Sequence, residues 1–486
     1  MRLLIALFCL SFLVRWYRLP EYLFFGYEQG RDALVIADLY TLKDFTLIGP
    51  KTDIDGIFHG PWYYYLMTVP YGLTGGNPLG ASLTLVTLTS LVPLVMYLLI
   101  KEVLGSWKWT LVAALITVFS FEAITYSRWL HHYSFSLLLV PLFFYSVWRY
   151  HKTNKGLYFL SSAVFAAFAS QFEIVLVFQF AFVYLLLLFR QLVALPSRKT
   201  LLASIGATLA IFSPLIIFNF RHQFITISAI IKFLVSPGQR SLSLWGRVQE
   251  YLDSLIVIVN RSLVDLPDPI LALPFYLILI VGLYLYWKDK NGRVPIYFFL
   301  AWSLMTLPIV FFGVYLQQLY VGSGLGWIGL LGLSLYGLWQ RAATRVLGLL
   351  ILGIVFVSWT HNLSKIDANR GFYFVTIQDD LNLQDQQNLL RFVHQDSAGQ
   401  PYKLIAFTIP YFHQEAWDYL ADFYYPRDQH QNSRLVYLVI ESQVAPYHQE
   451  QWINDLGQTF LLEERKFGKI RLQKRNLVQQ SETTRI

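Results

Sequence analysis

The long apolar runs of residues 1–360 constrain the fold of this chain more than any other feature of its sequence. A helix needs about 20 mainly apolar residues to cross a bilayer, and about 11 runs approach that length. Only 14% of the residues are charged, against about 25% in soluble proteins, so a water-facing surface could not be built around these runs. The sequence therefore predicts a polytopic α-helical membrane protein. Its candidate spans are 2–19, 79–100, 109–126, 132–148, 157–170, 174–189, 200–218, 269–287, 295–312, 323–339 and 346–360.

The last part of the chain has a different composition. Residues 361–486 resemble a soluble protein, and strand-like runs alternate in them with helix-like runs. We therefore expect a transmembrane domain of residues 1–360 followed by a small soluble α/β domain of residues 361–486. The lone cysteine, Cys9, excludes an intramolecular disulfide and a cysteine-based metal site. The strand-like runs are 404–409 and 435–441, and the helix-like runs are 378–394, 413–424 and 447–457.

Lysine and arginine are divided unevenly between the loops. With the N-terminus in the cytoplasm, the loops on that side hold about 13 of these cations in about 39 residues, against about 9 in about 130 residues on the other side. An odd number of spans then places the C-terminal domain outside, with the long loops 20–78 and 219–268. We therefore expect a multi-pass protein of the cytoplasmic (inner) membrane with an extracytoplasmic C-terminal domain. The cytoplasmic cations are Lys101, Lys108, Arg149, Lys152, Lys155, Arg190, Arg198, Lys199, Lys288, Lys290, Arg293, Arg341 and Arg345.

The net charge of +8 follows from this topology and does not indicate a nucleic-acid partner. The first apolar run is expected to stay in the protein, because no small-residue cleavage site follows it and residues 15–18 resemble an interfacial anchor. In loop 20–78 we expect two helical pieces, at about 28–42 and 60–71.

Two clusters of polar residues in the first outer loop are candidates for chemistry. Glu28 and Asp32 are spaced to share one helix face, with Arg31 between them. An acidic first turn of a helix is the structural alternative. His59 precedes a Gly-Pro pair and Tyr63, and a histidine in such a place often serves structure alone.

Two more candidates lie at the outer ends of later spans. Arg128, in the sequence Tyr126-Ser127-Arg128-Trp129, is a cation on the side where the charge rule disfavours one. Arg221 and His222 are the last two residues of the sequence Phe218–His222, at the outer end of another span. Arg221 is therefore a second cation on the side that the charge rule disfavours. Each arginine either snorkels to lipid headgroups or holds a bound anion.

Together these residues suit transfer chemistry with a phosphate leaving group at the membrane surface. A carboxylate takes the proton of an attacking hydroxyl, and guanidinium groups neutralise the charge that develops on the phosphate. A lipid-linked donor explains why such a site would lie next to the bilayer.

The order of these motifs resembles the membrane-embedded GT-C glycosyltransferases. The matching pieces are residues 15–20, the acidic motif early in the first outer loop, and residues 59–66 from His59-Gly60-Pro61 onward. Within these enzymes, the sequence is most similar to family 39, which contains protein O-mannosyltransferases and bacterial aminoarabinose-transferase-like enzymes. Residues 126–128 and 218–222 also resemble that branch, and the resemblance covers about residues 1–225.

The resemblance implies an inverting transferase that moves a sugar from a polyprenyl-phosphate donor to an acceptor hydroxyl on the outer side. It implies a carboxylate base at Glu28, with Asp32 as the second candidate, and Arg128, Arg221 and Arg31 as ligands of the donor phosphate. His59, Tyr63 and His222 would contact substrate. Neither a nucleotide-sugar site nor another cofactor is expected.

The sequence departs from the family at one functional position. Where the family usually has aspartate, often in an Asp-Glu pair, this chain has Glu28-Gln29. The carboxylate is kept on an arm longer by one methylene, which leaves open whether Glu28 or Asp32 is the base.

Two other functional classes remain open: an O-antigen-type polymerase or ligase, and a lipid or polysaccharide transporter. A transporter usually has charges at mid-membrane, whereas Glu122 and Glu173 both lie near outer span ends. The acceptor class, lipid, glycan or protein, is left open. Asp53, Asp55 and His59 could bind a cation, but acidic turns form without metal more often, so no metal is expected.

Overall fold

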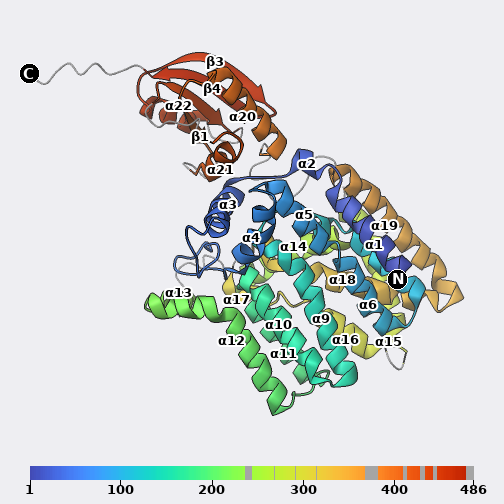
Figure 1. Ribbon diagram of the computed structural model, residues 1–486. Coiled ribbons are helices and arrows are strands. Elements are labelled where there is room, and N and C mark those ends of the chain that lie inside the picture. The colour runs from blue at the N-terminus through green and yellow to red at the C-terminus, as the bar shows by residue number, and fades with distance from the viewer. Residues whose placement is uncertain are drawn as a thin grey trace, which may run out of the picture. The chain divides into compact units, whose positions relative to one another are not determined.

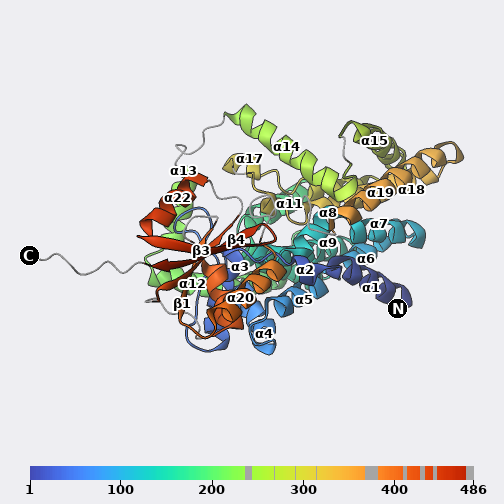
Figure 2. The same cartoon turned by 90° about the horizontal axis from the view of Figure 1, so that it is seen from above.

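The computed structural model describes residues 1–235, 243–266, 269–289, 292–313, 315–366, 381–408, 413–426, 433–441 and 446–477 (Figures 1 and 2). The chain forms two compact units, each built from separate stretches of sequence. Unit 1 contains residues 1–17, 45–66 and 82–367, and unit 2 contains residues 18–44, 67–81 and 368–486. Two of the boundaries between them fall inside helices α4 (Trp62–Leu73) and α5 (Pro78–Thr89). Lys290, one of the predicted cytoplasmic cations, lies outside the described residues.

The regular elements in the described part of unit 1 are helices, apart from a single β-bridge between Lys51 and Phe58. Short 3-10 turns join several of the helices: η1 (His132–Phe135), η3 (Pro269–Ala272), η4 (Gln317–Tyr320) and η5 (Ala342–Thr344). Its helices are α1 (Arg2–Trp16), α6 (Val92–Leu104), α7 (Trp107–Phe119), α8 (Phe121–Arg128), α9 (Ser136–Thr153), α10 (Gly156–Phe172), α11 (Leu176–Phe189), α12 (Arg198–Arg221), α13 (Ile225–Val235), α14 (Leu244–Leu263), α15 (Leu273–Trp287), α16 (Arg293–Ser303), α17 (Ile309–Phe312), α18 (Ser323–Trp339) and α19 (Arg345–Ile366).

Every candidate span overlaps one helix or two consecutive elements; residues 79–100, for example, overlap α5 and α6. In the described part of the chain, four helical segments are long and apolar enough to cross a membrane, or five if α7 and α8, bent by 49° at Ser120, form one span. Shorter apolar helices include α10, α11, α15 and α18. Leu202, Ile205 and Leu209 are exposed on α12, which suits contact with lipid. The count of about 11 spans stays a prediction.

Helix α18 lies at the centre of unit 1 and is buried along almost all of its length. Its glycines let neighbouring backbones approach closely. A Cβ at Gly326 would lie 2.7 Å from the backbone nitrogen of Ser303 in α16, and one at Gly337 would lie 2.4 Å from the carbonyl oxygen of Gly282 in α15. The hydroxyl of Ser334 donates to the carbonyl of Leu279 at 2.9 Å. Small residues and interhelical hydrogen bonds therefore hold these helices together, as is usual in a membrane.

Arg15, expected to be part of an interfacial anchor, is instead completely buried in unit 1. Its guanidinium donates to the hydroxyls of Ser11 at 2.7 Å and Ser127 at 2.9 Å. The expectation was wrong for this residue because hydroxyls from its own helix and from α8 take the place of water. Tyr17, two residues on, is exposed.

Unit 2 contains a four-stranded sheet in the order β1-β2-β4-β3. Strands β1 (Tyr402–Phe407) and β2 (Leu435–Ile440) are parallel, and β3 (Thr459–Phe467) and β4 (Ile470–Leu477) form an antiparallel hairpin beside β2. Helix α22 (Pro446–Asp455) covers one face, where Trp452 packs on Phe407, Val436, Leu438 and Ile440. The other face carries Tyr437, whose hydroxyl donates to Asp396 of α20 (Leu383–Ser397) at 2.5 Å. Helices therefore cover both faces, as expected of a small α/β domain (Figure 2).

Unit 2 also includes helices from the first outer loop. These are α2 (Leu19–Tyr22) and α3 (Tyr27–Tyr40), and α3 packs against α21 (Glu415–Tyr424). The chain just before α3 pairs with the chain at the start of α20: Leu383 donates its backbone N–H to Leu23 at 2.8 Å, and Phe25 donates to Leu381 at 3.3 Å. The first part of this loop, with α2 and α3, thus folds into one unit with the C-terminal sheet.

Candidate functional site

Helix α3 begins at the acidic motif of the first outer loop. Gly26 is its N-cap, and the backbone N–H of Gly26 donates to Oε1 of Gln29 at 3.1 Å, which is the half of a capping box that the N3 side chain provides. Gln29 is buried, whereas Glu28 in the same turn is half-buried. An amide oxygen accepts this hydrogen bond as well as a carboxylate oxygen does. Gln29 therefore preserves the start of the helix, although the resembling family often has glutamate at this position.

Asp32 lies one turn further along α3 and forms an ion pair with Arg31. Nε and Nη2 of Arg31 both lie 2.9 Å from Oδ1 of Asp32, whose exposed fraction is 1%. The Arg31 guanidinium also lies over the ring of Tyr27, 5.5 Å from its centroid. A buried carboxylate is usually held in this way by a cation, so the structure gives Asp32 a role in orienting Arg31.

Helix α21 supports the same turn of α3. A Cβ at Gly30 would lie only 2.3 Å from the backbone nitrogen and Cα of Ala416, so the two helices touch backbone to backbone. The ring of Tyr27 lies 4.4 Å from that of His413, and Nδ1 of His413 lies 3.2 Å from a carboxylate oxygen of Glu415. The C-terminal part of the chain therefore positions the helix that carries Glu28.

Arg128, at the end of α8 in unit 1, is buried with an exposed fraction of 1%. Its Nη1 donates to the carbonyl of Arg15 at 3.1 Å and to that of Tyr17 at 2.7 Å. A guanidinium in this position satisfies carbonyls at the C-terminal end of α1. The alternative that Arg128 snorkels to lipid headgroups is wrong, because the side chain is enclosed.

Arg221 and His222 lie exposed at the end of α12. Nδ1 of His222 lies 2.9 Å from the carbonyl oxygen of Phe218, and the two rings stack at 4.1 Å. Phe218 in turn meets Phe58 edge-on at 5.4 Å. This contact brings the motif around residue 59 next to the motif at 218–222, two of the four clusters that the sequence singled out. In the described part of the chain, Arg221 forms no ion pair.

His59 and Tyr63 meet residues that the sequence analysis did not select. The ring of His59 lies 4.3 Å from that of His132 in η1, and Tyr63 meets His132 edge-on at 6.1 Å. Glu173, between α10 and α11, completes the cluster: one possible ligand atom each from His59, His132 and Glu173 lie within 4.8 Å of one another, and all three residues are buried. The available signal was the His131-His132 pair in a short outer loop.

Burial raises the pKa of Glu173 to about 8, and the nearby Asp53 raises it further, while the backbone N–H of Val175 opposes the shift. Val175 donates to the Glu173 carboxylate at 3.2 Å. Asp53 and Asp55 themselves are exposed. A carboxyl group with this pKa is mostly protonated at neutral pH unless a cation lies beside it.

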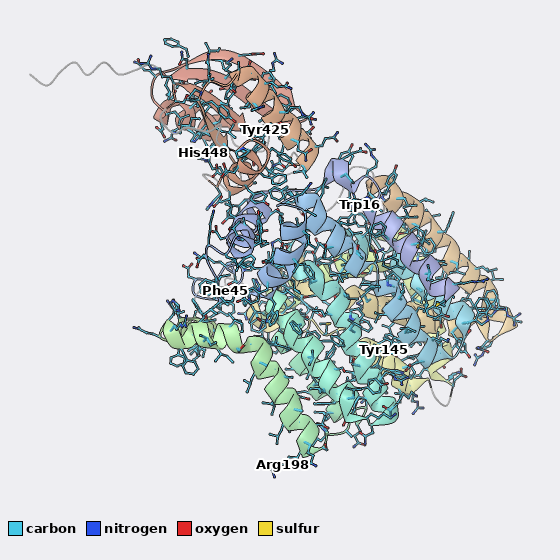
Figure 3. The ribbon with its side chains drawn as sticks, viewed as in Figure 1. Trp16, Phe45, Tyr145, Arg198, Tyr425 and His448 are labelled. Atoms are coloured by element: carbon cyan, nitrogen blue, oxygen red, sulfur yellow. The ribbon has the colours of Figure 1, made fainter. Side chains whose placement is uncertain are left out.

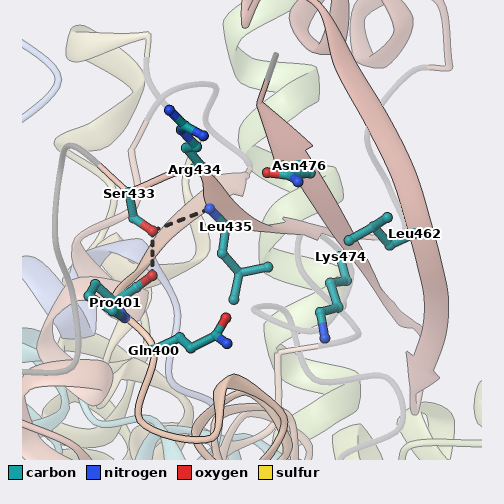
Figure 4. Close-up of a pocket in the computed structure, with 8 residues that line it drawn as sticks. All are labelled: Gln400, Pro401, Ser433, Arg434, Leu435, Leu462, Lys474 and Asn476. Atoms are coloured by element: carbon teal, nitrogen blue, oxygen red, sulfur yellow. Dashed lines mark hydrogen bonds between the residues drawn. The ribbon is translucent and has the colours of Figure 1, made fainter. Parts of the chain in front are cut away.

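Unit 2 has a pocket of about 770 Å³ at the ends of its central strands (Figure 4). The Ser433 hydroxyl bridges two strands there by donating to the carbonyl of Pro401 and accepting from the N–H of Leu435 at 3.2 Å. Lys474 forms an ion pair with Asp396 at 2.7 Å. None of the residues that the sequence selected lines this pocket. Its lining residues are Gln400, Pro401, Ser433, Arg434, Leu435, Leu462, Lys474 and Asn476.

The candidate residues are divided between the two units. His59, Tyr63, Arg128, Arg221 and His222 belong to unit 1. The acidic cluster, Glu28, Arg31 and Asp32, belongs to unit 2. Within unit 1 the structure places both His59 and Tyr63 beside His132, and it brings the segment 218–222 next to Phe58.

No protein-family model and no curated protein matches this sequence. Solved structures do match it. ArnT from Cupriavidus metallidurans, in the apo state and bound to undecaprenyl phosphate, has a TM-score of 0.57 at 11% identity, over 97% of this chain and 97% of that chain. The Archaeoglobus fulgidus oligosaccharyltransferase, in complex with Zn and sulfate, has a TM-score of 0.50 at 13% identity, over 90% of this chain and 67% of that chain. The predicted fold class, a polytopic helical membrane protein with a small C-terminal α/β domain, is thereby confirmed.

Proposed function

Because the chain has the GT-C fold of these two transferases, we propose that it is an inverting glycosyltransferase. It moves a sugar from a polyprenyl-phosphate donor to an acceptor hydroxyl at the outer face of the cytoplasmic membrane. The observation that carries this proposal is the match to ArnT, which extends over 97% of both chains and includes a structure bound to undecaprenyl phosphate. The acceptor is a lipid, a glycan or a protein.

The proposed reaction needs a base and a site for phosphate. Glu28 takes the proton from the acceptor hydroxyl as its oxygen attacks the anomeric carbon, and the bond from that carbon to the phosphate oxygen breaks. The polyprenyl phosphate leaves with the electron pair, and inversion follows from attack opposite the leaving group. Half-buried Glu28 suits this role better than Asp32, whose carboxylate is buried against Arg31.

Arg221, Arg128 and Arg31 are proposed to hold the donor phosphate, with His59, Tyr63 and His222 against the substrate. Arg221 is the best supported of the three arginines, since it is exposed and ends a helix next to the His59 motif. Nη1 of Arg128 is already engaged with two backbone carbonyls. We expect the contribution of Arg128 to come mostly from fixing the end of α1.

The direct test is an assay of the purified full-length protein with a polyprenyl-phosphate-linked sugar and envelope extracts as the source of acceptor. We expect sugar transfer with release of one polyprenyl phosphate for each sugar and no diphosphate product. Release of a polyprenyl diphosphate would instead indicate a polymerase or ligase. Movement of the intact lipid between vesicle leaflets without cleavage would indicate a transporter.

The proposed topology predicts how cysteine tags react in intact cells. A tag at Lys155 should be shielded from a membrane-impermeant thiol reagent, and so should a tag at Lys290, because the charge bias places both loops in the cytoplasm. A tag at exposed Phe460 of β3 should react without lysis. The experiment uses a Cys9→Ser background. Reaction of the β3 tag only after lysis would contradict the proposed orientation.

For the phosphate ligand, Arg221→Lys should weaken donor use by roughly tenfold or more while protein abundance stays near normal. A guanidinium binds phosphate through two parallel hydrogen bonds, which lysine cannot reproduce. Arg198→Lys, at the opposite end of α12, is the matched control and should leave donor use unchanged (Figure 3). Donor titrations of both variants provide the measurement. If Arg221→Lys turns over donor like the parent, the arginine only anchors the helix end.

A further inference from the structure

His132 and Glu173 have no role in the proposed transfer reaction, and together with His59 they form a cluster in unit 1. Its members come from three distant stretches of sequence: the segment before α4, the turn η1, and the α10–α11 connection. Their exposed fractions are 5%, 4% and 3%. All three belong to the residue types that bind transition-metal ions.

The backbone holds two of these residues in place before any ligand arrives. The N–H of His59 donates to the carbonyl of Pro50 at 3.0 Å, and its carbonyl accepts from Gly49 at 2.9 Å. The N–H of Gly60 donates to the carbonyl of Gln171 at 2.8 Å, which joins the His59 segment to the end of α10 two residues before Glu173. Because the backbone is already fixed, little free energy is needed to order these side chains when a ligand binds.

Two buried polar groups lie at this place, the carboxyl group of Glu173 and the amide of Gln171. Within the described chain, the first has no ion-pair partner and the second has no hydrogen-bond partner. The Glu173 carboxylate accepts the N–H of Val175, and among the described residues no lysine or arginine forms an ion pair with it. The side-chain amide of Gln171 is fully buried, and neither its nitrogen nor its oxygen has a hydrogen-bond partner in the described structure. A buried amide normally finds a hydrogen-bond partner, so the Gln171 amide marks this place as one that a further ligand or water would complete.

We propose that His59, His132 and Glu173 bind a divalent transition-metal ion of the zinc class. Two imidazoles and one carboxylate suit zinc and its neighbours, whereas magnesium and calcium prefer all-oxygen sites. In a tetrahedral zinc site with bonds of about 2.0–2.1 Å, ligand atoms lie about 3.4 Å apart. The present spread of up to 4.8 Å therefore has to contract by about 1.4 Å or less, which side-chain rotation can supply.

Three protein ligands leave one position of such an ion open to water or an anionic oxygen. The Gln171 amide lies against Gly60, the residue after His59, and is the candidate outer-shell partner of a ligand or of that water. The ion would tie the His59 segment to η1 and to the α10–α11 connection. This assignment revises the expectation of no metal and stands whether or not the chain is a transferase.

The test measures metal binding by the purified full-length protein in detergent after removal of bound metal with a chelator. Titration with Zn²⁺ should load one ion per chain, and Co²⁺ should give the visible absorption of a four- or five-coordinate site with nitrogen and oxygen ligands. His132→Gln and Glu173→Gln should each weaken Zn²⁺ binding by more than about 100-fold, since even loss of an outer-shell partner costs about 10–100-fold. His131→Gln is the matched control, because His131 is the buried neighbour of His132 outside the cluster, and it should keep the ion.

Zn²⁺ binding to the parent no stronger than to the His132→Gln variant would overturn the proposal. A second measurement does not depend on the variants folding. X-ray absorption of the Zn²⁺-loaded parent should show two imidazole ligands. Fewer than two imidazoles, or sulfur from Cys9 as a ligand, would place the ion elsewhere and would also overturn the proposal.

Discussion

Glu28→Gln should lower sugar transfer by about 10²–10⁴-fold, the usual effect of losing a general base. Glutamine keeps the size of the side chain and can still form hydrogen bonds, but it cannot take a proton from the acceptor hydroxyl. The hydrogen bond that caps the start of α3 joins Gly26 and Gln29, so it should survive the substitution. Turnover and donor binding are measured separately, and donor binding should be largely retained.

Two further variants distinguish the possible bases. Glu28→Asp restores the residue usual in the resembling family and should retain measurable activity. Asp32→Asn removes a charge that pairs with Arg31, so it should disturb the position of Arg31 and reduce activity less than Glu28→Gln does. Near-parental turnover in Glu28→Gln, together with an inactive Asp32→Asn, would assign the base to Asp32.

Gly30→Ala should destabilise unit 2 and reduce activity along with it. The added Cβ would lie 2.3 Å from backbone atoms of Ala416, and backbone cannot rotate aside as a side chain can. Overpacking costs about 1–3 kcal/mol in a well-packed core, and contact with backbone places this variant at the upper end of that range. We expect proteolysis within residues 381–477 at lower temperature than in the parent, and less sugar transfer because α3 carries Glu28.

Gly206→Ala is the matched control for this prediction. Gly206 also lies in a helix, but a Cβ there would have no atom within 4 Å. The variant should therefore fold and turn over like the parent. Equal stability of Gly30→Ala and Gly206→Ala would show that α3 and α21 do not pack as tightly as the structure has them.

Hydrophobic periodicity was enough to predict the elements of regular structure that bury an apolar face. The runs at 28–42 and 60–71 correspond to α3 and α4, and the strand-like runs at 404–409 and 435–441 correspond to β1 and β2. The hairpin of β3 and β4 was missed. Most residues of β3 are exposed and many are charged, so the strand has no apolar run to indicate it.

The sequence could not predict contacts between residues far apart in the chain. Arg128 was selected for its charge on the outer side, but its burial follows from how α8 meets the end of α1. His132 and Glu173 become neighbours of His59 only once η1 and α10 have packed. Periodicity describes one element at a time, and a site assembled from several elements depends on tertiary packing that periodicity does not contain.

The pairing of the first outer loop with the C-terminal sheet has a consequence for how the protein is made. A chain is synthesised from its N-terminus, and folding usually follows that order. Helix α3 emerges early, yet α21 and the backbone around Leu381 and Leu383, which hold it, belong to the last part to be synthesised. Contacts so distant in sequence form late. The turn that carries Glu28 therefore lacks its contacts with α21 until nearly the whole chain has been translated.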